Sequence, residues 1–72
     1  MRHYPTLGER LHYARRLSGY TQGALARQAG VTDRYIKYLE KNEKTPRDKT
    51  LIRLANVLHV TPEYLKRGAP PA

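Results

Sequence analysis

The sequence predicts an all-α domain of five short helices, and three observations carry this prediction. Apolar residues recur three, four and seven positions apart in several segments, which is the spacing of one face of an α-helix. No segment shows the apolar–polar alternation that is typical of a β-strand. A threonine in the position of a helix N-cap precedes four of the five segments, as Thr6, Thr21, Thr32 and Thr61.

Length and composition limit the class of protein. A chain of 72 residues forms one small domain, and well-capped helices are an economical way to stabilise so small a core. The absence of cysteine excludes a disulfide framework, a thiolate zinc site and a cysteine nucleophile. Fourteen Lys and Arg against six Asp and Glu give a net charge of +8. This excess predicts an anionic partner, and nucleic acid is favoured over an acidic membrane surface or an acidic protein.

Hydropathy argues against a membrane protein. The mean hydropathy is −0.79, and no apolar run is long enough for a transmembrane helix. The first five residues lack the apolar core of a signal peptide. We therefore expect a cytoplasmic protein with no membrane association.

The first helix is expected to follow a flexible N-terminal arm, residues 1–5. Thr6 and Glu9 fit a capping box, in which each side chain satisfies a free backbone amide at the helix start. Ser18 and Gly19 end the helix. Arginines line its other sides, and Arg10 and Arg16 are expected to attract nucleic acid without sequence preference. The core-facing residues are Leu7, Leu11 and Ala14.

Residues 22–41 predict two further helices joined by a tight turn. Gly30 can adopt a positive φ and so end the earlier helix, while Val31 fills the corner. Thr32 caps the later helix, and Asp33 lies at its positive end. The inward residues of the pair are Leu25, Ala26, Ala29, Ile36 and Leu39.

The later helix of this pair has a cationic and aromatic outer face. Its outward residues are spaced i, i+3, i+4 and i+7, so they form one stripe. Such a stripe suits a nucleic-acid groove, although a charged stripe often only keeps a surface helix hydrated. Its place in a helix-turn-helix favours the groove. This outer stripe consists of Arg34, Lys37, Tyr38 and Lys41.

Two more helices complete the domain, which is expected to span residues 6–68. Residues 43–47 form a basic loop, and a helix follows from about Asp48 to Leu58. Thr61, Pro62 and Glu63 form a strong start for a short last helix, which carries Tyr64 and Leu65 onto the core and stops at Gly68. Residues 69–72 read as a flexible tail or a linker stub.

A longer pattern, T-Q-x-x-L-A-x-x-A-G-V-T-x-x-Y-I-x-x-L-E from Thr21 to Glu40, resembles the helix-turn-helix of the phage repressor/Cro (XRE-type) family. The resemblance covers about residues 7–68. It implies a five-helix lambda-repressor-like DNA-binding domain with the helix-turn-helix at helices 2 and 3. The implied function is that of a sequence-specific transcriptional regulator, a repressor, that reads the major groove of double-stranded DNA with helix 3, about Asp33–Lys41.

The resemblance also implies how individual side chains contact DNA. Arg34 is expected to grip guanine O6 and N7, and Asp33 to accept from a cytosine or adenine amine. Tyr35 and Tyr38 would touch a thymine methyl or a phosphate, and Lys37 a base or the backbone. Two alternatives stay open: Asp33 and Lys37 pair with each other at i, i+4, and Tyr35 is partly core.

Phosphate contacts, an ion pair and a dimer are implied in the same way. Arg15 is expected to pair with Glu40, although both side chains could instead be solvated. The family binds as a homodimer on pseudo-palindromic operators, which here involves Leu58, His59 and Val60 unless these are core. Asn42 and His59 stand where the family has glycine, and both residue types tolerate positive φ. The expected phosphate contacts are Gln22, Lys41, Asn42, Lys44, Thr45 and Arg47, with ordinary solvated surface residues as the alternative.

Other classes of function fit less well. The same basic surface would suit an antitoxin-type module that binds a partner protein and DNA, or an RNA-associated domain. An enzyme is not expected, because Ser18 is the only serine and the glycines form no phosphate loop. The three histidines do not fall at metal-ligand spacing, so no metal or cofactor is expected, and His12 reads as a surface residue.

Overall fold

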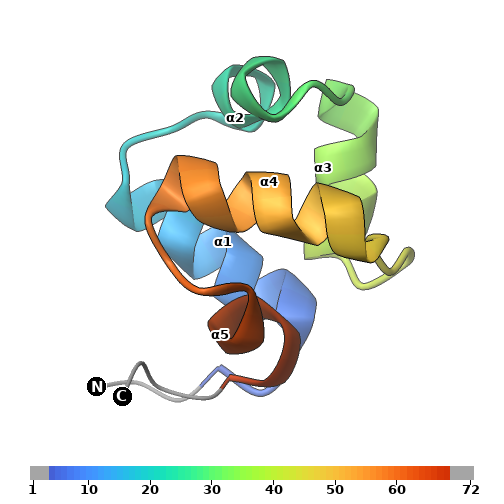
Figure 1. Ribbon diagram of the computed structural model, residues 1–72. Helices are drawn as coiled ribbons and strands as arrows, with labels where there is room; N and C mark the ends of the chain where they lie inside the picture. The colour runs from blue at the N-terminus through green and yellow to red at the C-terminus, as the bar shows by residue number, and fades with distance from the viewer. Residues whose placement is uncertain (1–3, 69–72) are drawn as a thin grey trace.

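The computed structural model describes residues 4–68, and it contains the five expected helices. No strand occurs within these residues. Residues 1–3 of the expected arm and the expected tail, residues 69–72, lie outside the described residues. The all-α prediction is therefore confirmed, with α1 at Leu7–Leu17, α2 at Gln22–Ala29, α3 at Asp33–Glu40, α4 at Asp48–Leu58 and α5 at Pro62–Arg67 (Figure 1).

The threonine N-caps form as expected. Each of the four side chains accepts a hydrogen bond from the backbone N–H three residues further on, at 3.0–3.2 Å. The capping box of α1 differs in one detail. The Glu9 carboxylate accepts from the Thr6 hydroxyl at 3.1 Å instead of from the Thr6 backbone N–H.

The ends of the helices adopt the left-handed conformation where the sequence allowed it. Gly30 ends α2 with φ 73°. Asn42 and His59 take φ values of 62° and 57° without being glycine, so their expected tolerance of this conformation is confirmed. α3 ends at Glu40, one residue earlier than predicted, because Lys41 forms its C-cap.

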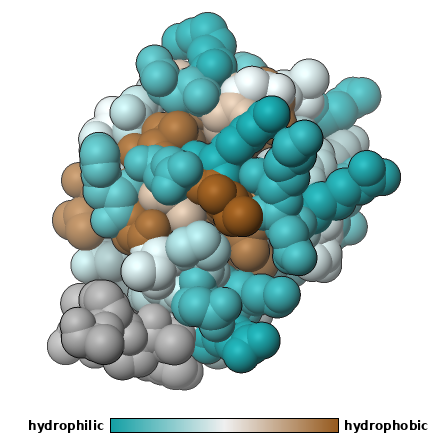
Figure 2. Space-filling model, viewed as in Figure 1, coloured by the Kyte–Doolittle hydropathy of each residue, from teal (hydrophilic) through white to brown (hydrophobic). Residues whose placement is uncertain are grey.

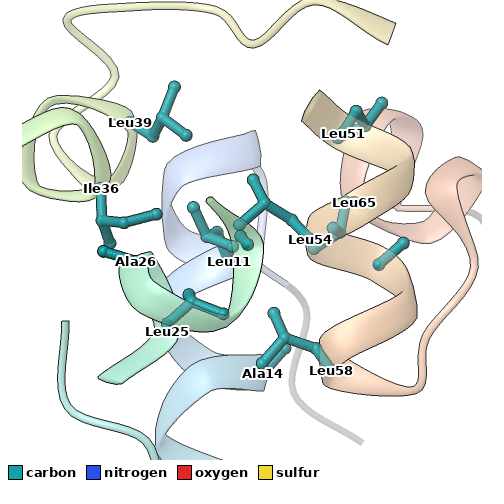
Figure 3. Packing of buried hydrophobic residues seen from close by; sticks show 12 residues of the cluster. Leu11, Ala14, Leu25, Ala26, Ile36, Leu39, Leu51, Leu54, Leu58 and Leu65 are labelled. Carbon is teal, nitrogen blue, oxygen red and sulfur yellow. The ribbon is translucent and has the colours of Figure 1, made fainter. Parts of the chain in front are cut away.

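The core lies where α1, α2, α3 and α4 converge (Figure 3), and α5 closes it at the bottom of the view in Figure 1. In the view of Figure 1, α4 passes in front of α1, α3 lies at the upper right and α5 lies at the bottom. The six largest of the fully buried side chains lie at the centre: Leu11, Leu25, Ile36, Leu39, Leu54 and Leu65. All of them come from positions on the apolar faces of the helices, so packing of those faces fixes the direction in which α3 presents its other side.

Arg10 is buried, which makes the expectation of a surface cation at this position wrong. Its side chain is 5% exposed, and its guanidinium donates to the carbonyl oxygens of Leu65 and Lys66 at 3.0 Å each and of Tyr4 at 2.7 Å. Carbonyl groups in the last turn of a helix lack intrahelical partners, so a guanidinium is a favourable ligand for them. Tyr4 also stacks on Tyr13, with 4.6 Å between the ring centroids.

Gly8 permits a close approach of α1 to the end of α3. A Cβ at this position would lie 2.6 Å from the carbonyl oxygens of both Leu39 and Glu40, and backbone atoms cannot easily withdraw. We expect Gly8→Ala to destabilise the domain by about 1–3 kcal/mol in urea unfolding. Gly23→Ala is the matched control, because its new Cβ meets only the ends of side chains, the Asp33 carboxylate at 2.9 Å and the Arg27 guanidinium at 3.6 Å. Equal midpoints for the two variants would contradict this reading of the contact.

Candidate nucleic-acid interface

The outer stripe of α3 faces solvent. Arg34, Lys37 and Lys41 are exposed and Tyr38 is half-buried, whereas Ile36 and Leu39 on the opposite side are fully buried. The side of the molecule formed by α3 and the following loop is covered by hydrophilic side chains (Figure 2). No acidic residue of α3 interrupts the stripe, since Asp33 lies before it and Glu40 turns inward. The helix thus offers a cationic surface on a rigid support.

Asp33 and Tyr35 lie at the edges of this surface. The Asp33 carboxylate turns back towards α2, because a Cβ built on Gly23 would be 2.9 Å from its Oδ2. Among the described residues, no ion pair joins Asp33 to Lys37, so the alternative of an i, i+4 pair is not seen. Tyr35 is half-buried and packs against the core, which agrees with the alternative that Tyr35 is partly core.

The basic loop after α3 borders a shallow cleft beside the start of that helix. Lys44, Thr45 and Arg47 are exposed, while the buried Pro46 between them anchors the loop. The cleft brings these expected phosphate ligands together with Tyr35 and with the N-cap of α3. Its walls are Val31, Thr32, Tyr35, Lys44, Thr45, Arg47 and Thr50.

Asn42 differs from its neighbours in the loop because its side chain is already bonded within the protein. Its Oδ1 accepts from the backbone N–H of Gly8 at 2.9 Å, and its Nδ2 donates to the Thr6 hydroxyl at 3.1 Å. The side chain therefore joins the start of α1 to the end of α3. We assign Asn42 this structural role and leave it out of the interface proposed below.

A second polar group, the Glu40 cluster, lies behind the stripe and consists of Glu40, Arg15, His12 and Gln22. The Arg15 Nε is 2.6 Å from Glu40 Oε2, and its Nη2 is 3.2 Å from Oε1. Both side chains are nearly buried, at 10% and 6% exposure. Arg15 also donates to the carbonyl of Tyr20 at 2.8 Å, which fixes the approach to α2. The structure thus forms the ion pair that the resemblance implied.

The remaining members of the Glu40 cluster are His12 and Gln22. Gln22 donates from Nε2 to Glu40 Oε1 at 3.1 Å, and His12 Nδ1 lies 2.9 Å from the same oxygen. Burial would raise the pKa of the Glu40 carboxyl, but the hydrogen bonds from Arg15, His12 and Gln22 and the charge of Arg15 outweigh it and lower the pKa below its usual value. The carboxylate is therefore the favoured form inside the fold.

The lowered pKa predicts how acid weakens the domain. A carboxyl whose pKa is lower in the folded state stabilises the fold above its unfolded value, near 4.5, and loses this contribution as the pH falls through the folded pKa. We expect the stability advantage of the wild type over Glu40→Gln to be constant near neutral pH and to shrink below about pH 4.5. Urea unfolding of both proteins from neutral pH to below about pH 4.5 tests this expectation. A difference in the free energy of unfolding that stays constant into strong acid would contradict it.

Two further observations concern the described residues as a whole. No helix among residues 4–68 is long and apolar enough to cross a membrane. Within the same residues, no group of three or more His, Asp or Glu side chains gathers as metal ligands would.

The fold and the exposed stripe together define a helix-turn-helix domain of the repressor type. A model of the helix-turn-helix family matches residues 11–65. The chain belongs to this family, among the Cro/C1-type (XRE) domains of phage repressors and their bacterial relatives.

Curated relatives are similar to most of this chain. The transcriptional regulator ImmR of Bacillus subtilis is 33% identical over 60 residues, which is 83% of this chain and 47% of that protein. The repressor protein C2 of Salmonella phage P22 is 32% identical over 62 residues, 86% of this chain and 29% of that protein. The chain thus spans less than half the length of these two relatives.

Solved structures share the same fold. The P22 c2 repressor in complex with a synthetic operator has a TM-score of 0.88 and 30% identity, over 92% of this chain and all of that one. The biofilm regulator SinR, a Bacillus subtilis protein, has a TM-score of 0.80 and 31% identity in its complex with DNA, over 83% of this chain and 97% of that one.

Proposed function

We propose that this chain binds double-stranded DNA in a sequence-specific manner and acts as a transcriptional repressor. The observation that carries the proposal is the outer stripe of α3, which is cationic, exposed and held on a packed scaffold. An α-helix fits the major groove of B-DNA, where every base pair presents a distinct pattern of donors and acceptors. Two proteins that share this fold at about 30% identity, the P22 c2 repressor and the regulator SinR, have structures in complex with DNA.

Within the proposal, the first turns of α3 read base edges. Arg34 has the strongest case, because it is exposed and a guanidinium matches guanine O6 and N7 with two hydrogen bonds. Lys37 and Tyr38 follow one turn further along the stripe. Asp33 and Tyr35 contribute at the margins, where Asp33 would accept from a base amine and Tyr35 would contact a methyl or a phosphate.

The phosphate contacts proposed for this domain lie on both sides of α3. Lys44, Thr45 and Arg47 supply them from the basic loop, and Lys41 from the end of the helix. On the other side, Gln22 stands at the start of α2, where free backbone amides also favour an anion. If about four to six phosphates are neutralised, log K falls against log[salt] with a slope of roughly −4 to −5 per monomer.

We also propose that the domain binds as a homodimer to a pseudo-palindromic operator. One domain of this size offers a single reading helix, and two half-sites one helical turn apart double the contacts. Leu58 belongs to the core at 3% exposure, so it is not available for a dimer contact. The exposed His59 and the half-buried Val60 remain the candidates for this contact.

Selection from a random pool of duplexes tests the proposal. We expect one recurring sequence with two related halves, bound with the salt slope given above, and a complex of two chains per duplex in sedimentation. Single-stranded RNA of the same length should compete weakly. Equal binding of all duplexes, or RNA binding as tight as that of the winning duplex, would overturn the proposal.

A further inference from the structure

Three donors surround one oxygen in the Glu40 cluster. Glu40 Oε1 lies 2.9 Å from His12 Nδ1, 3.1 Å from Gln22 Nε2 and 3.2 Å from Arg15 Nη2. A carboxylate oxygen offers about two lone-pair directions, so it can take two of these three donors in well-aligned hydrogen bonds. Arg15 is secured in addition through Oε2 at 2.6 Å, which leaves His12 and Gln22 as the partners that Oε1 must accommodate.

The geometry of Gln22 connects this cluster to the interface. Its Nε2 carries two hydrogens, and the one that points to Glu40 leaves the second free to bind another acceptor. A phosphate oxygen that accepted this second hydrogen would lie roughly 4–6 Å from Glu40 Oε1, given a usual N–H···O distance of about 2.9 Å. An uncovered carboxylate at that separation would repel the phosphate.

His12 is placed to cover this carboxylate on its outer side. Its side chain is 47% exposed, whereas that of Arg15 is 10% exposed and reaches Glu40 from within the fold. We propose that His12 is a positioning residue of the DNA site, which donates from Nδ1 to Glu40 and so holds Gln22 in place for a phosphate. This inference rests on the proposed DNA binding and adds a residue that makes no contact with DNA itself.

The imidazole of His12 has a second possible hydrogen-bond partner besides Glu40. His12 Nδ1 also lies 3.1 Å from Arg15 Nη2, which can only donate. Nδ1 therefore accepts from Arg15 if it carries no hydrogen, and donates to Glu40 if it carries one. The proposal requires the second form, in which the hydrogen of Nδ1 covers Oε1.

Substitutions of His12 that place a nitrogen at different positions test the proposal. Asparagine puts its amide nitrogen where Nδ1 stands, whereas glutamine carries its nitrogen further from the backbone. We expect His12→Ala and His12→Gln to weaken binding of the selected duplex about 3- to 10-fold, the size of one lost hydrogen bond. His12→Asn should bind within about twofold of the wild type. Circular dichroism and urea unfolding of each variant verify the fold.

The Gln22→Ala background separates positioning from other effects. There, the effect of His12→Ala on affinity should be clearly smaller than in the wild type, because the side chain that it positions is absent. Wild-type affinity for His12→Ala, failure of His12→Asn to restore binding, or an unchanged effect in the Gln22→Ala background would each overturn the inference. A wild type that selects no duplex would overturn the proposed function itself, which is a different result from a binding protein that is indifferent to His12.

Discussion

Replacing Arg34 by Ala is expected to weaken binding of the selected duplex by about 1–3 kcal/mol, roughly 5- to 150-fold. Arg34 is exposed at the start of α3. Among the side chains of the stripe it is best suited to a guanine edge, because its guanidinium can donate to both O6 and N7. The affinity for unrelated duplexes should fall much less, because one lost charge weakens non-specific binding only slightly. Titration of both duplexes at one salt concentration measures the difference.

Arg67→Ala is the matched control for this experiment. It also removes one arginine, but from α5, which contributes no residue to the outer stripe or to the basic loop. Its side chain is 68% exposed, so its loss should leave both the fold and the discrimination between duplexes unchanged. If Arg34→Ala, like Arg67→Ala, lowered the affinity for both duplexes by the same factor, Arg34 would act through its charge alone and would not read the sequence.

Replacing Arg15 by Met should have the largest effect on stability, about 3–5 kcal/mol. The change leaves the carboxylate of Glu40, only 6% exposed, without the partner that binds both of its oxygens. A domain of this length has roughly 4–11 kcal/mol of stability in total, so much of it would be lost. Urea unfolding at neutral pH measures the cost.

A double variant shows whether this loss of stability comes from the unpaired charge of Glu40 or from the loss of the ion pair itself. Replacing both members of a buried pair by apolar residues removes the unpaired charge, and this is often close to neutral for stability. Arg15→Met with Glu40→Leu should therefore be more stable than Arg15→Met alone. A double variant that is as unstable as the single one would mean that the ion pair itself stabilises the fold.

The sequence was sufficient to predict the helices because the signals for them are local. Thr6, Thr21, Thr32 and Thr61 cap helices within three residues of themselves, and the apolar spacing identifies the buried faces. The direction of the outer stripe follows from the same spacing, since Ile36 and Leu39 determine which side of α3 is buried.

Contacts between distant segments could not be predicted in this way. Arg10 looked like any surface arginine, and only the folded chain brings the end of α5, 55 residues away, against its guanidinium. Gly8 had no local signal either, because its requirement for a small residue comes from the carbonyl groups at the end of α3. His12 is exposed, as expected, but nothing in its neighbourhood along the chain indicates its contact with Glu40.

The central claim is that the outer stripe of α3 reads base edges in the major groove, and the N7 of guanine provides a direct test. We would replace each guanine of the selected duplex in turn by 7-deazaguanine, which removes N7 and leaves Watson–Crick pairing and the minor groove intact. The account predicts weaker binding at one guanine in each half-site for the wild type, and no effect of the same replacement on Arg34→Ala. Undiminished wild-type binding at every position, or an equal loss for Arg34→Ala, would contradict it.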